Sequence, residues 1–282
     1  MVKLSENEIE ILKKTEIDLL VRIKKIFESN NLRYVALHGT LLGTIRHNGF
    51  IPWDDDIDLG MPRSDYNFMI EHFDELFPND IGLVSPENTK HYEVMFAKIH
   101  DKKTTYIELG MMDKPDRYTG VFIDIFPLDG VPSDKKCQAE FKKNYQKYMF
   151  WNYKLRFSIK DVHTIRAKIL HFVTAPLRGI LPYDYYYKKY IGMISKNDFD
   201  TSEFWTYPTT VYRHNYIYRK QIFNDILDHD FENIKIAIPT GYDEFLSQSF
   251  GDYMKLPPEE DRIPHHYADF VSFEIPYEEY RR

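Results

Sequence analysis

The sequence has a single cysteine, Cys137, so no disulfide can form within the chain and nothing in it indicates an oxidising compartment. No apolar run reaches the roughly 18 residues that a membrane-spanning helix needs. The N-terminal stretch carries charged side chains throughout and lacks the basic start and apolar segment of a signal peptide. We therefore expect a cytoplasmic protein without a membrane span.

Acidic residues outnumber basic ones, which gives a formal net charge of -7. A charge of this sign disfavours a broad basic surface, so we expect no binding of nucleic acid. Low-complexity tracts and repeats are absent, and hydrophobic residues make up 43% of the chain, which indicates a folded globular protein. A length of 282 residues suits one catalytic core with an elaboration, and no pattern indicates an oligomeric state.

Hydrophobic spacing predicts the secondary structure of the first half of the chain. The apolar residues of 5–28 have helical spacing. A strand at 34–37, a turn at Gly39-Thr40 and a helix at 41–47 capped by Thr40 form a strand, turn, helix unit. Further elements are expected as strands at 56–61, 93–100 and 120–126, and as helices at 64–77, capped by Ser64, and 242–250.

This order of elements predicts an α/β (α+β) fold with a mixed sheet flanked by helices. We divide the chain into a catalytic core at 1–135, a helical insertion at 136–232 that supplies acceptor or specificity contacts, and a C-terminal helix and tail at 233–282. The tail contains Pro257-Pro258, which excludes regular structure there. We expect this tail to return to the core and fold over a cleft.

Four carboxylates lie within five residues, at Asp54, Asp55, Asp56 and Asp58. Such a cluster repels itself unless a cation or water relieves the repulsion. A solvated acidic turn is one interpretation. The other is a metal site, because alternation along a strand points Asp56 and Asp58 the same way, and two oxygen ligands on one face suit Mg²⁺.

Gly39-Thr40 lies upstream of this cluster, at the predicted turn from strand to helix. Backbone N–H groups at such a turn, together with a helix N-terminus, favour phosphate oxygens. A plain turn is the alternative interpretation. In combination with the acidic pair, the turn predicts a site that binds both a metal ion and a phosphate.

Asp124 interrupts the apolar run 121–126, where a buried carboxylate needs a partner. One interpretation is a structural ion pair with a nearby Arg or Lys. The other joins Asp124 to Asp56 and Asp58 in a three-carboxylate site, which can hold two metal ions about 4 Å apart. Mg²⁺ is the expected ion, in one or two copies, with Mn²⁺ as the alternative.

Arg46 and Lys98 are the cationic candidates, because Arg46 follows the turn on its predicted helix and Lys98 lies inside the apolar stretch 95–99. Either can neutralise a donor phosphate. The alternatives are an Arg46 at the surface and a Lys98 whose amine reaches solvent. His265 and His266 lack further ligands at zinc spacing, so we expect them at the surface or lining the cleft.

Four blocks of sequence, read in order, resemble one known family. They are GTLLGTIRHNGFIPWDDDIDLGMPRSDY, AKIHDKKT, GVFIDIFPLDGVP and FGDYMKLPPEEDRIPHH. The chain resembles the LicD family, which includes bacterial phosphorylcholine transferases and is related to fukutin-related protein. The first block is highly specific, the others become specific in combination, and the middle of the chain matches only loosely.

The resemblance implies a nucleotidyltransferase-like fold, in which a Gly-Gly or Gly-Ser turn precedes an acidic pair and a third acid follows on a later strand. Thr40 replaces the commoner Ser or Gly and keeps a hydroxyl. The expected catalytic residues and metal ligands are then Asp56, Asp58 and Asp124. The residues expected to bind the donor are Gly39, Thr40, Arg46 and Lys98.

The resemblance further implies a CDP-alcohol donor, with CDP-choline favoured, and CMP as the leaving group. The acceptor is a glycan or lipid-linked saccharide, such as a teichoic acid or lipopolysaccharide precursor. Asp124 either completes the metal site or takes the proton of the acceptor hydroxyl. Two other functions stay open from the residues alone: a nucleotidyltransferase that transfers NMP to a small molecule or protein, and a carbohydrate-binding scaffold with a relic site.

A basic apolar stretch at 164–181 bears on localisation. Its residues Arg166, Lys168, Phe172 and Arg178 can rest on an anionic membrane face if the acceptor is lipid-linked. A helix packed within the insertion is the favoured interpretation. Peripheral contact with the inner membrane face is therefore the alternative to a purely cytoplasmic location.

Overall fold

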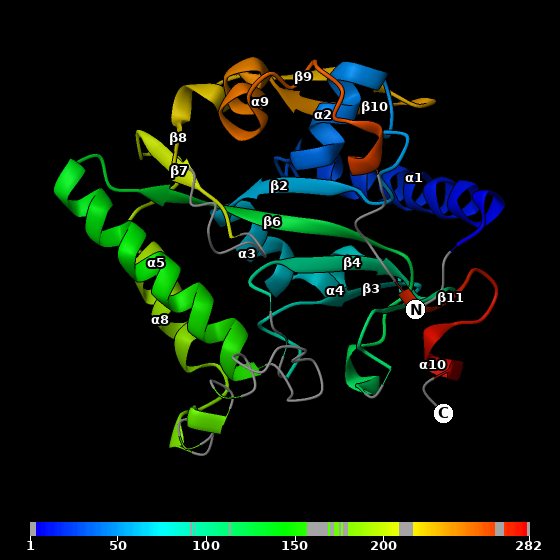
Figure 1. Cartoon of the computed structure of the whole chain (residues 1–282), viewed down its shortest axis with the longest axis horizontal. Coiled ribbons are helices and arrows are strands. Elements are labelled where there is room, and N and C mark those ends of the chain that lie inside the picture. Colours follow the sequence, from blue (N-terminus) through cyan, green and yellow to red (C-terminus); the bar gives the residue numbers. More distant parts are fainter. Residues whose placement is uncertain are drawn as a thin grey trace.

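In the computed structural model, helices lie against a mixed β-sheet, so the predicted α+β class is confirmed (Figure 1). The structure describes residues 4–90, 92, 94–112, 114–156, 169, 172–174, 176, 180–208, 217–262 and 268–280. His265, His266, Arg166, Lys168 and Arg178 lie outside the described residues, so their predicted roles stay predictions.

The strands are short, apart from one at the centre of the main sheet. Their bounds are β1 Val35–Ala36, β2 Asp58–Pro62, β3 Ile81–Val84, β4 Ala97–Asp101, β5 Thr105–Glu108, β6 Phe122–Val131, β7 Phe204–Thr206, β8 Tyr218–Arg219, β9 Ile226–Phe231, β10 Ile234–Pro239 and β11 Ala268–Ser272. The main sheet has the order β1-β2-β6-β4-β3, and β6 also pairs with β7, which pairs with β8. The pair β2–β6 is parallel, whereas the other pairs are antiparallel.

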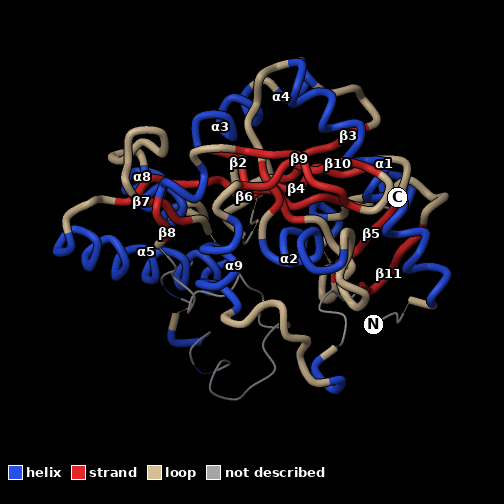
Figure 2. The backbone as a smooth tube through the Cα atoms, turned by 90° about the horizontal axis from the view of Figure 1, so that it is seen from above, coloured by secondary structure: helices blue, strands red, loops and turns tan. Residues whose placement is uncertain are grey.

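Helices cover the main sheet from more than one side. Their bounds are α1 Glu6–Ser29, α2 His38–His47, α3 Arg63–Glu71, α4 Phe73–Leu76, α5 Lys135–Arg156, α8 Tyr185–Ile194, α9 Tyr242–Phe250 and α10 Tyr277–Tyr280, with 3-10 turns η1 Pro115–Arg117, η3 Lys220–Phe223 and η4 Glu259–Asp261. Figure 2 shows α3 and α4 on one side of the strands, and α2 and α9 on the other.

Helix α1 follows its sequence signals closely. Ser5 and Glu8 form a capping box, in which the Ser5 hydroxyl accepts from the Glu8 backbone N–H and the Glu8 carboxylate accepts from the Ser5 N–H. One face of the helix buries an apolar stripe that includes Leu19, Ile23 and Phe27. The helix predicted at 5–28 is therefore confirmed to within one residue at each end.

Strand β6 forms the middle of the sheet, and all ten of its residues are buried. A strand covered on both faces is a nearly continuous apolar run rather than an alternating one. The apolar run 121–126 belongs to this class, and the strand continues past the predicted end to Val131, where it pairs with β7. The two acids of β6, Asp124 and Asp129, are thus placed inside the protein.

Two predicted helix caps are wrong because the side chains concerned bond elsewhere. Helix α2 begins at His38, so Thr40 lies inside its first turn, and the Thr40 hydroxyl accepts from the backbone N–H of Asp58. Helix α3 begins at Arg63, and the Ser64 hydroxyl donates to the carboxylate of Asp65. Local capping rules are overridden at both positions by side-chain contacts.

Helices account for only part of the segment expected to form a helical insertion at 136–232. Helices α5 and α8 pack on each other and on Val131, with Tyr145 and Tyr190 in the apolar cluster between them. Strands β7, β8 and β9 lie in the same segment. The backbone N–H and C=O groups of β6 beyond Phe126 need hydrogen-bond partners, and pairing with β7 supplies some of them.

The stretch predicted to contact a membrane is described at a few positions only. Ile169, Phe172 and Val173 are 58%, 66% and 69% exposed, so these three side chains do not pack in the core. Among the described residues, no helix combines the length and the apolar character needed to cross a membrane.

A buried ion pair connects α3, β6 and α8. The Arg63 guanidinium donates from Nε and Nη2 to the two carboxylate oxygens of Asp129, at 2.6 and 3.1 Å. The Tyr190 hydroxyl donates to the same carboxylate. The Asp129 side chain is fully buried, so this pair stands in a region of low polarity.

We predict that Asp129→Ala lowers the free energy of unfolding by about 3–5 kcal/mol, because it leaves the Arg63 charge buried without its partner. The control is Asp200→Ala, which removes a partner of the exposed Arg33 and costs less than about 1 kcal/mol. Urea unfolding of both variants measures the difference. Equal losses in the two variants would contradict the assignment.

Candidate active site

Three neighbouring strands bring charged side chains side by side at the centre of the sheet. In the parallel pair β2–β6, Asp58 is the partner of Asp124. In the antiparallel pair β6–β4, Asp124 is the partner of Lys98. Paired positions on adjacent strands project from the same face of a sheet. One face therefore carries the row Asp58, Asp124, Lys98.

Asp56 joins this row from the loop that precedes β2, so strand alternation does not explain its direction. Carboxylate oxygens of Asp56, Asp58 and Asp124 lie within 4.8 Å of one another. The three residues are 9%, 8% and 6% exposed. A hard divalent cation relieves the repulsion among buried carboxylates and takes oxygen ligands of this kind. The chemistry of these three residues thus fits a metal ion.

Thr40 holds one of these acids in place. Its Oγ1 accepts a hydrogen bond from the Asp58 backbone N–H at 2.8 Å, and its carbonyl accepts from the Thr44 hydroxyl at 2.6 Å. Thr40 is almost fully buried. The hydroxyl therefore fixes the start of β2 relative to α2, and its predicted contact with a donor phosphate stays a prediction.

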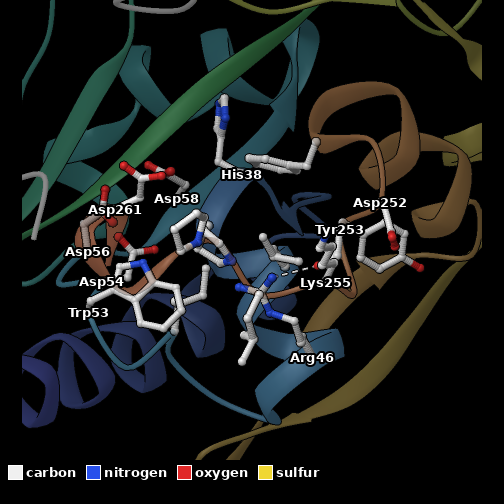
Figure 3. A pocket seen from close by; sticks show the side chains of 17 residues that line it. His38, Arg46, Trp53, Asp54, Asp56, Asp58, Asp252, Tyr253, Lys255 and Asp261 are labelled. Atoms are coloured by element: carbon white, nitrogen blue, oxygen red, sulfur yellow. Dashed lines mark hydrogen bonds between the residues drawn. The ribbon is translucent and has the colours of Figure 1, made fainter. Parts of the chain in front are cut away.

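A cavity of about 800 Å³ opens onto Asp56 and Asp58. In Figure 3, Trp53 and Asp54 lie near the two acids, whereas Arg46, Tyr253 and Lys255 lie on the other side of the cavity. Residues from the end of α9 to Asp261 form part of the lining. This part of the C-terminal segment therefore borders the cavity, and the predicted division of the chain stays a prediction.

Gly39 lines this cavity at the first turn of α2. A Cβ at this position would overlap the Asp54 carboxylate, so the missing side chain lets Asp54 approach the helix. No side-chain hydrogen bond caps α2. The predicted contact of this helix start with a donor phosphate stays a prediction.

Arg46 also lines the large cavity, at the last turn of α2. Its Nη1 donates to the carbonyl of Tyr253 at 2.7 Å. Burial lowers the pKa of Arg46, and the nearby guanidinium of Arg262 lowers it further. Arg46 therefore connects α2 to the C-terminal wall of the cavity, and its contact with a phosphate remains a prediction.

Lys98 lies between two carboxylates, with its Nζ 3.1 Å from Asp124 Oδ1 and 3.3 Å from Glu108 Oε1. Its Nζ is also 3.5 Å from the centre of the Phe122 ring. Burial alone would lower the pKa of Lys98, but the two carboxylates outweigh burial and raise it. The ion pair weighed as an alternative for Asp124 is thus confirmed, and the idea that the Lys98 amine reaches solvent is wrong.

Comparisons with known proteins decide the family. Residues 31–177 match the model of the LicD/FKTN/FKRP nucleotidyltransferase domain. The chain is 31% identical over 267 residues to the lipopolysaccharide cholinephosphotransferase LicD of Haemophilus influenzae, which covers 89% of this chain and 92% of that protein. The chain belongs to the LicD family. The prediction of a LicD-like transferase is therefore confirmed.

Shorter matches to uncharacterized proteins accompany this relative. One from Rickettsia typhi is 41% identical over 54 residues, which is 19% of this chain and 16% of that protein. One from Rickettsia prowazekii is 46% identical over 41 residues, which is 14% of this chain and 15% of that protein. These two matches are too short to bear on the function of the LicD-family chain.

The match to the LicD-family domain covers one side of the site. Residues 31–177 contain the three aspartates, Gly39 and Thr40 of α2, and Lys98. The cavity wall from Phe250 to Asp261 lies beyond the matched residues. The acidic centre therefore lies within the matched residues, whereas that wall comes from a part of the chain outside them.

His38 is a residue of the cavity that sequence reasoning missed. Its ring packs against Phe126 and Tyr207, with centroids 5.1 and 4.8 Å away, and its backbone has a left-handed φ of 44°. Burial lowers the pKa of His38 to about 4, so its ring is neutral at pH 7. A left-handed φ at a non-glycine residue often marks a functional site, and the only signal in the sequence was its place next to Gly39.

We predict that Thr40→Val lowers the free energy of unfolding by about 1–3 kcal/mol, because it leaves the Asp58 N–H buried without an acceptor. The affinity for Mg²⁺, measured by calorimetric titration, should fall as well, since Asp58 is displaced. Thr40→Ser keeps the hydroxyl and should retain both properties. If the valine and serine variants behaved alike, the positioning role of the Thr40 hydroxyl would be excluded.

Proposed function

We propose that this LicD-family protein transfers phosphocholine from CDP-choline to a sugar hydroxyl of a cell-surface glycan precursor, with CMP as the leaving group. The observation that carries the proposal is the group of three carboxylates, of which Asp56 and Asp58 line a cavity large enough for a nucleotide. The similarity to the Haemophilus influenzae cholinephosphotransferase supports the choice of phospho-alcohol.

Asp56, Asp58 and Asp124 would hold Mg²⁺, with Mn²⁺ as the alternative and a second ion as a further option. When bound, the ion neutralises the charge of the donor diphosphate. Phosphoryl transfer depends mainly on positioning and on stabilising charge, so few other catalytic groups are needed. Thr40 contributes by fixing the Asp58 backbone.

The side of the site at α2 would hold the donor phosphates. Gly39 lines the cavity at the first turn of α2, and Arg46 supplies a positive charge at the cavity wall. Asp124 has two roles open to it, as a metal ligand or as the acceptor of the hydroxyl proton. Its contact with Lys98 favours the ionised form that both roles require.

The charges around the large cavity support a donor with a cationic headgroup. Acids outnumber bases in its lining, which has Asp54, Asp56, Asp58, Asp252 and Asp261 against Arg46 and Lys255. Trp53 offers an aromatic ring, and the guanidinium of Arg262 already lies 5.6 Å from its centre. Quaternary ammonium groups bind to such combinations of aromatic rings and carboxylates. CDP-choline is therefore favoured over CDP-glycerol and CDP-ribitol, whose alcohols are neutral.

We predict that Asp58→Asn lowers the rate of phosphocholine transfer about 100-fold or more, because a ligand of the charge-stabilising ion is lost. The assay follows choline label from CDP-choline into a glycan acceptor, and in parallel nucleotide label from CTP. Asp74→Asn, which changes an exposed acid on α4, serves as the matched control and should retain activity. Nucleotide label in the acceptor without choline label would favour NMP transfer instead.

Ligand binding provides an independent test of the donor. With Mg²⁺ present, CDP-choline at 100 times its Kd should stabilise the protein by about 2.7 kcal/mol, measured as a rise in Tm. EDTA should abolish most of this rise. CDP-ethanolamine, CDP-glycerol and CDP-ribitol should give smaller shifts. A protein that responded to none of these four compounds would refute the proposal.

A further inference from the structure

A second, smaller cavity of about 120 Å³ lies against Asp124. Lys98 on β4, Glu108 on β5 and Arg117 on η1 supply its other charged side chains, and Phe96 and Met111 are among its apolar ones. It shares no lining residue with the large cavity, which meets Asp56 and Asp58. Asp56 and Asp58 therefore line the large cavity, whereas Asp124 of the same acidic group lines the small one.

This arrangement matches the geometry that phosphoryl transfer requires. The attacking oxygen and the leaving oxygen lie roughly in line, with the phosphorus between them. Carboxylate oxygens of Asp56, Asp58 and Asp124 lie within 4.8 Å of one another, so a phosphorus atom near the first two is also close to the third. A donor in the large cavity therefore leaves the small cavity for the nucleophile.

The walls of the small cavity favour an uncharged ligand rich in hydroxyl groups. Glu108 and Asp124 supply acceptors, whereas Lys98 and Arg117 supply donors. A cationic ligand would meet the two bases and an anionic ligand the two acids, but a polyol can bond to both. Apolar side chains, such as Phe96, suit the C–H groups of a sugar ring. Lys98 and Arg117 are positively charged, so they disfavour binding of a choline headgroup in the small cavity.

The volume of the small cavity limits the size of the ligand that it can hold. At about 120 Å³, the small cavity has less than a sixth of the volume of the large one. This space admits a hydroxyl group and the adjoining part of one sugar ring, but not a saccharide chain. The remainder of an acceptor would lie outside the cavity.

We propose that the small cavity is the acceptor subsite, which takes the reacting hydroxyl and the adjoining edge of a neutral sugar. This inference rests on the proposed function. The acceptor oxygen forms a new bond to the β-phosphorus of CDP-choline, and the bond from that phosphorus to the oxygen of CMP breaks. The hydroxyl proton is released to solvent, and CMP leaves with the bonding electron pair.

The test fills the small cavity without touching its charges. Met111→Trp places a large ring at the cavity, whereas Met112→Trp changes the neighbouring exposed residue, which does not line it. Saturation-transfer NMR with Mg²⁺ and CMP measures binding of methyl glucoside, methyl galactoside, glucosamine and glucuronate. Calorimetry measures the Kd of CDP-choline for each protein, and thermal unfolding shows that each is folded.

At least one neutral methyl glycoside should bind to the wild-type protein more tightly than the charged sugars. Met111→Trp should weaken this binding about tenfold or more, whereas Met112→Trp should retain it. The Kd of CDP-choline should stay the same in both variants. Arg117→Met should also weaken sugar binding, so the test stands even if the Met111 variant fails to fold.

Three results would overturn the assignment: wild-type protein that binds none of the sugars, Met111→Trp that binds them normally, or Met111→Trp that loses CDP-choline instead. The last result would place the small cavity within the donor site. If the wild-type protein bound the neutral sugar but neither bound nor cleaved CDP-choline, the proposed function would be refuted. Sugar binding in the small cavity would then be judged separately, from the Met111 and Met112 variants.

Discussion

The structure of the site depends on one buried contact, between the Lys98 ammonium and the Asp124 carboxylate at 3.1 Å. Asp124 lies beside two further acids, where a third negative charge is costly, and Lys98 lies where a lone ammonium would lose its proton. Each charge offsets the cost of burying the other, and the raised pKa of Lys98 reflects this attraction. Lys98 therefore offsets part of the negative charge of the acidic group, and a divalent cation would offset more of it.

The register of the strands determines which other side chains lie beside this contact. Because β6 pairs in parallel with β2 and antiparallel with β4, Asp124 has Asp58 on one side and Lys98 on the other. The Thr40 hydroxyl then fixes Asp58 from α2, through the first backbone N–H of β2. A shift of one residue in either strand pair would turn these side chains to opposite faces. The sheet thus determines both the spacing of the acids and the side on which each cavity lies.

Local pattern was enough to find the acids but not their partners. Asp124 stood out as a polar residue in an apolar run, and Asp56 and Asp58 as part of a cluster of like charges. The partner of Lys98 depends on strand order, which brings together positions far apart in sequence. Thr40 fits a helix cap by every local rule, yet its hydroxyl bonds to a backbone group 18 residues later. His38 carried no pattern of its own.

The two walls of the large cavity come from different parts of the chain, but they are not independent. The acids belong to the matched LicD domain, whereas the wall from Phe250 to Asp261 lies beyond it. Arg46 connects the two, because it stands on α2, which also carries Thr40, and it donates to the Tyr253 carbonyl. A substitution that moved this wall would therefore act on α2 and, through Thr40, on Asp58. Under the proposed function, the selectivity for the donor and the geometry of the metal site would be coupled through one short helix.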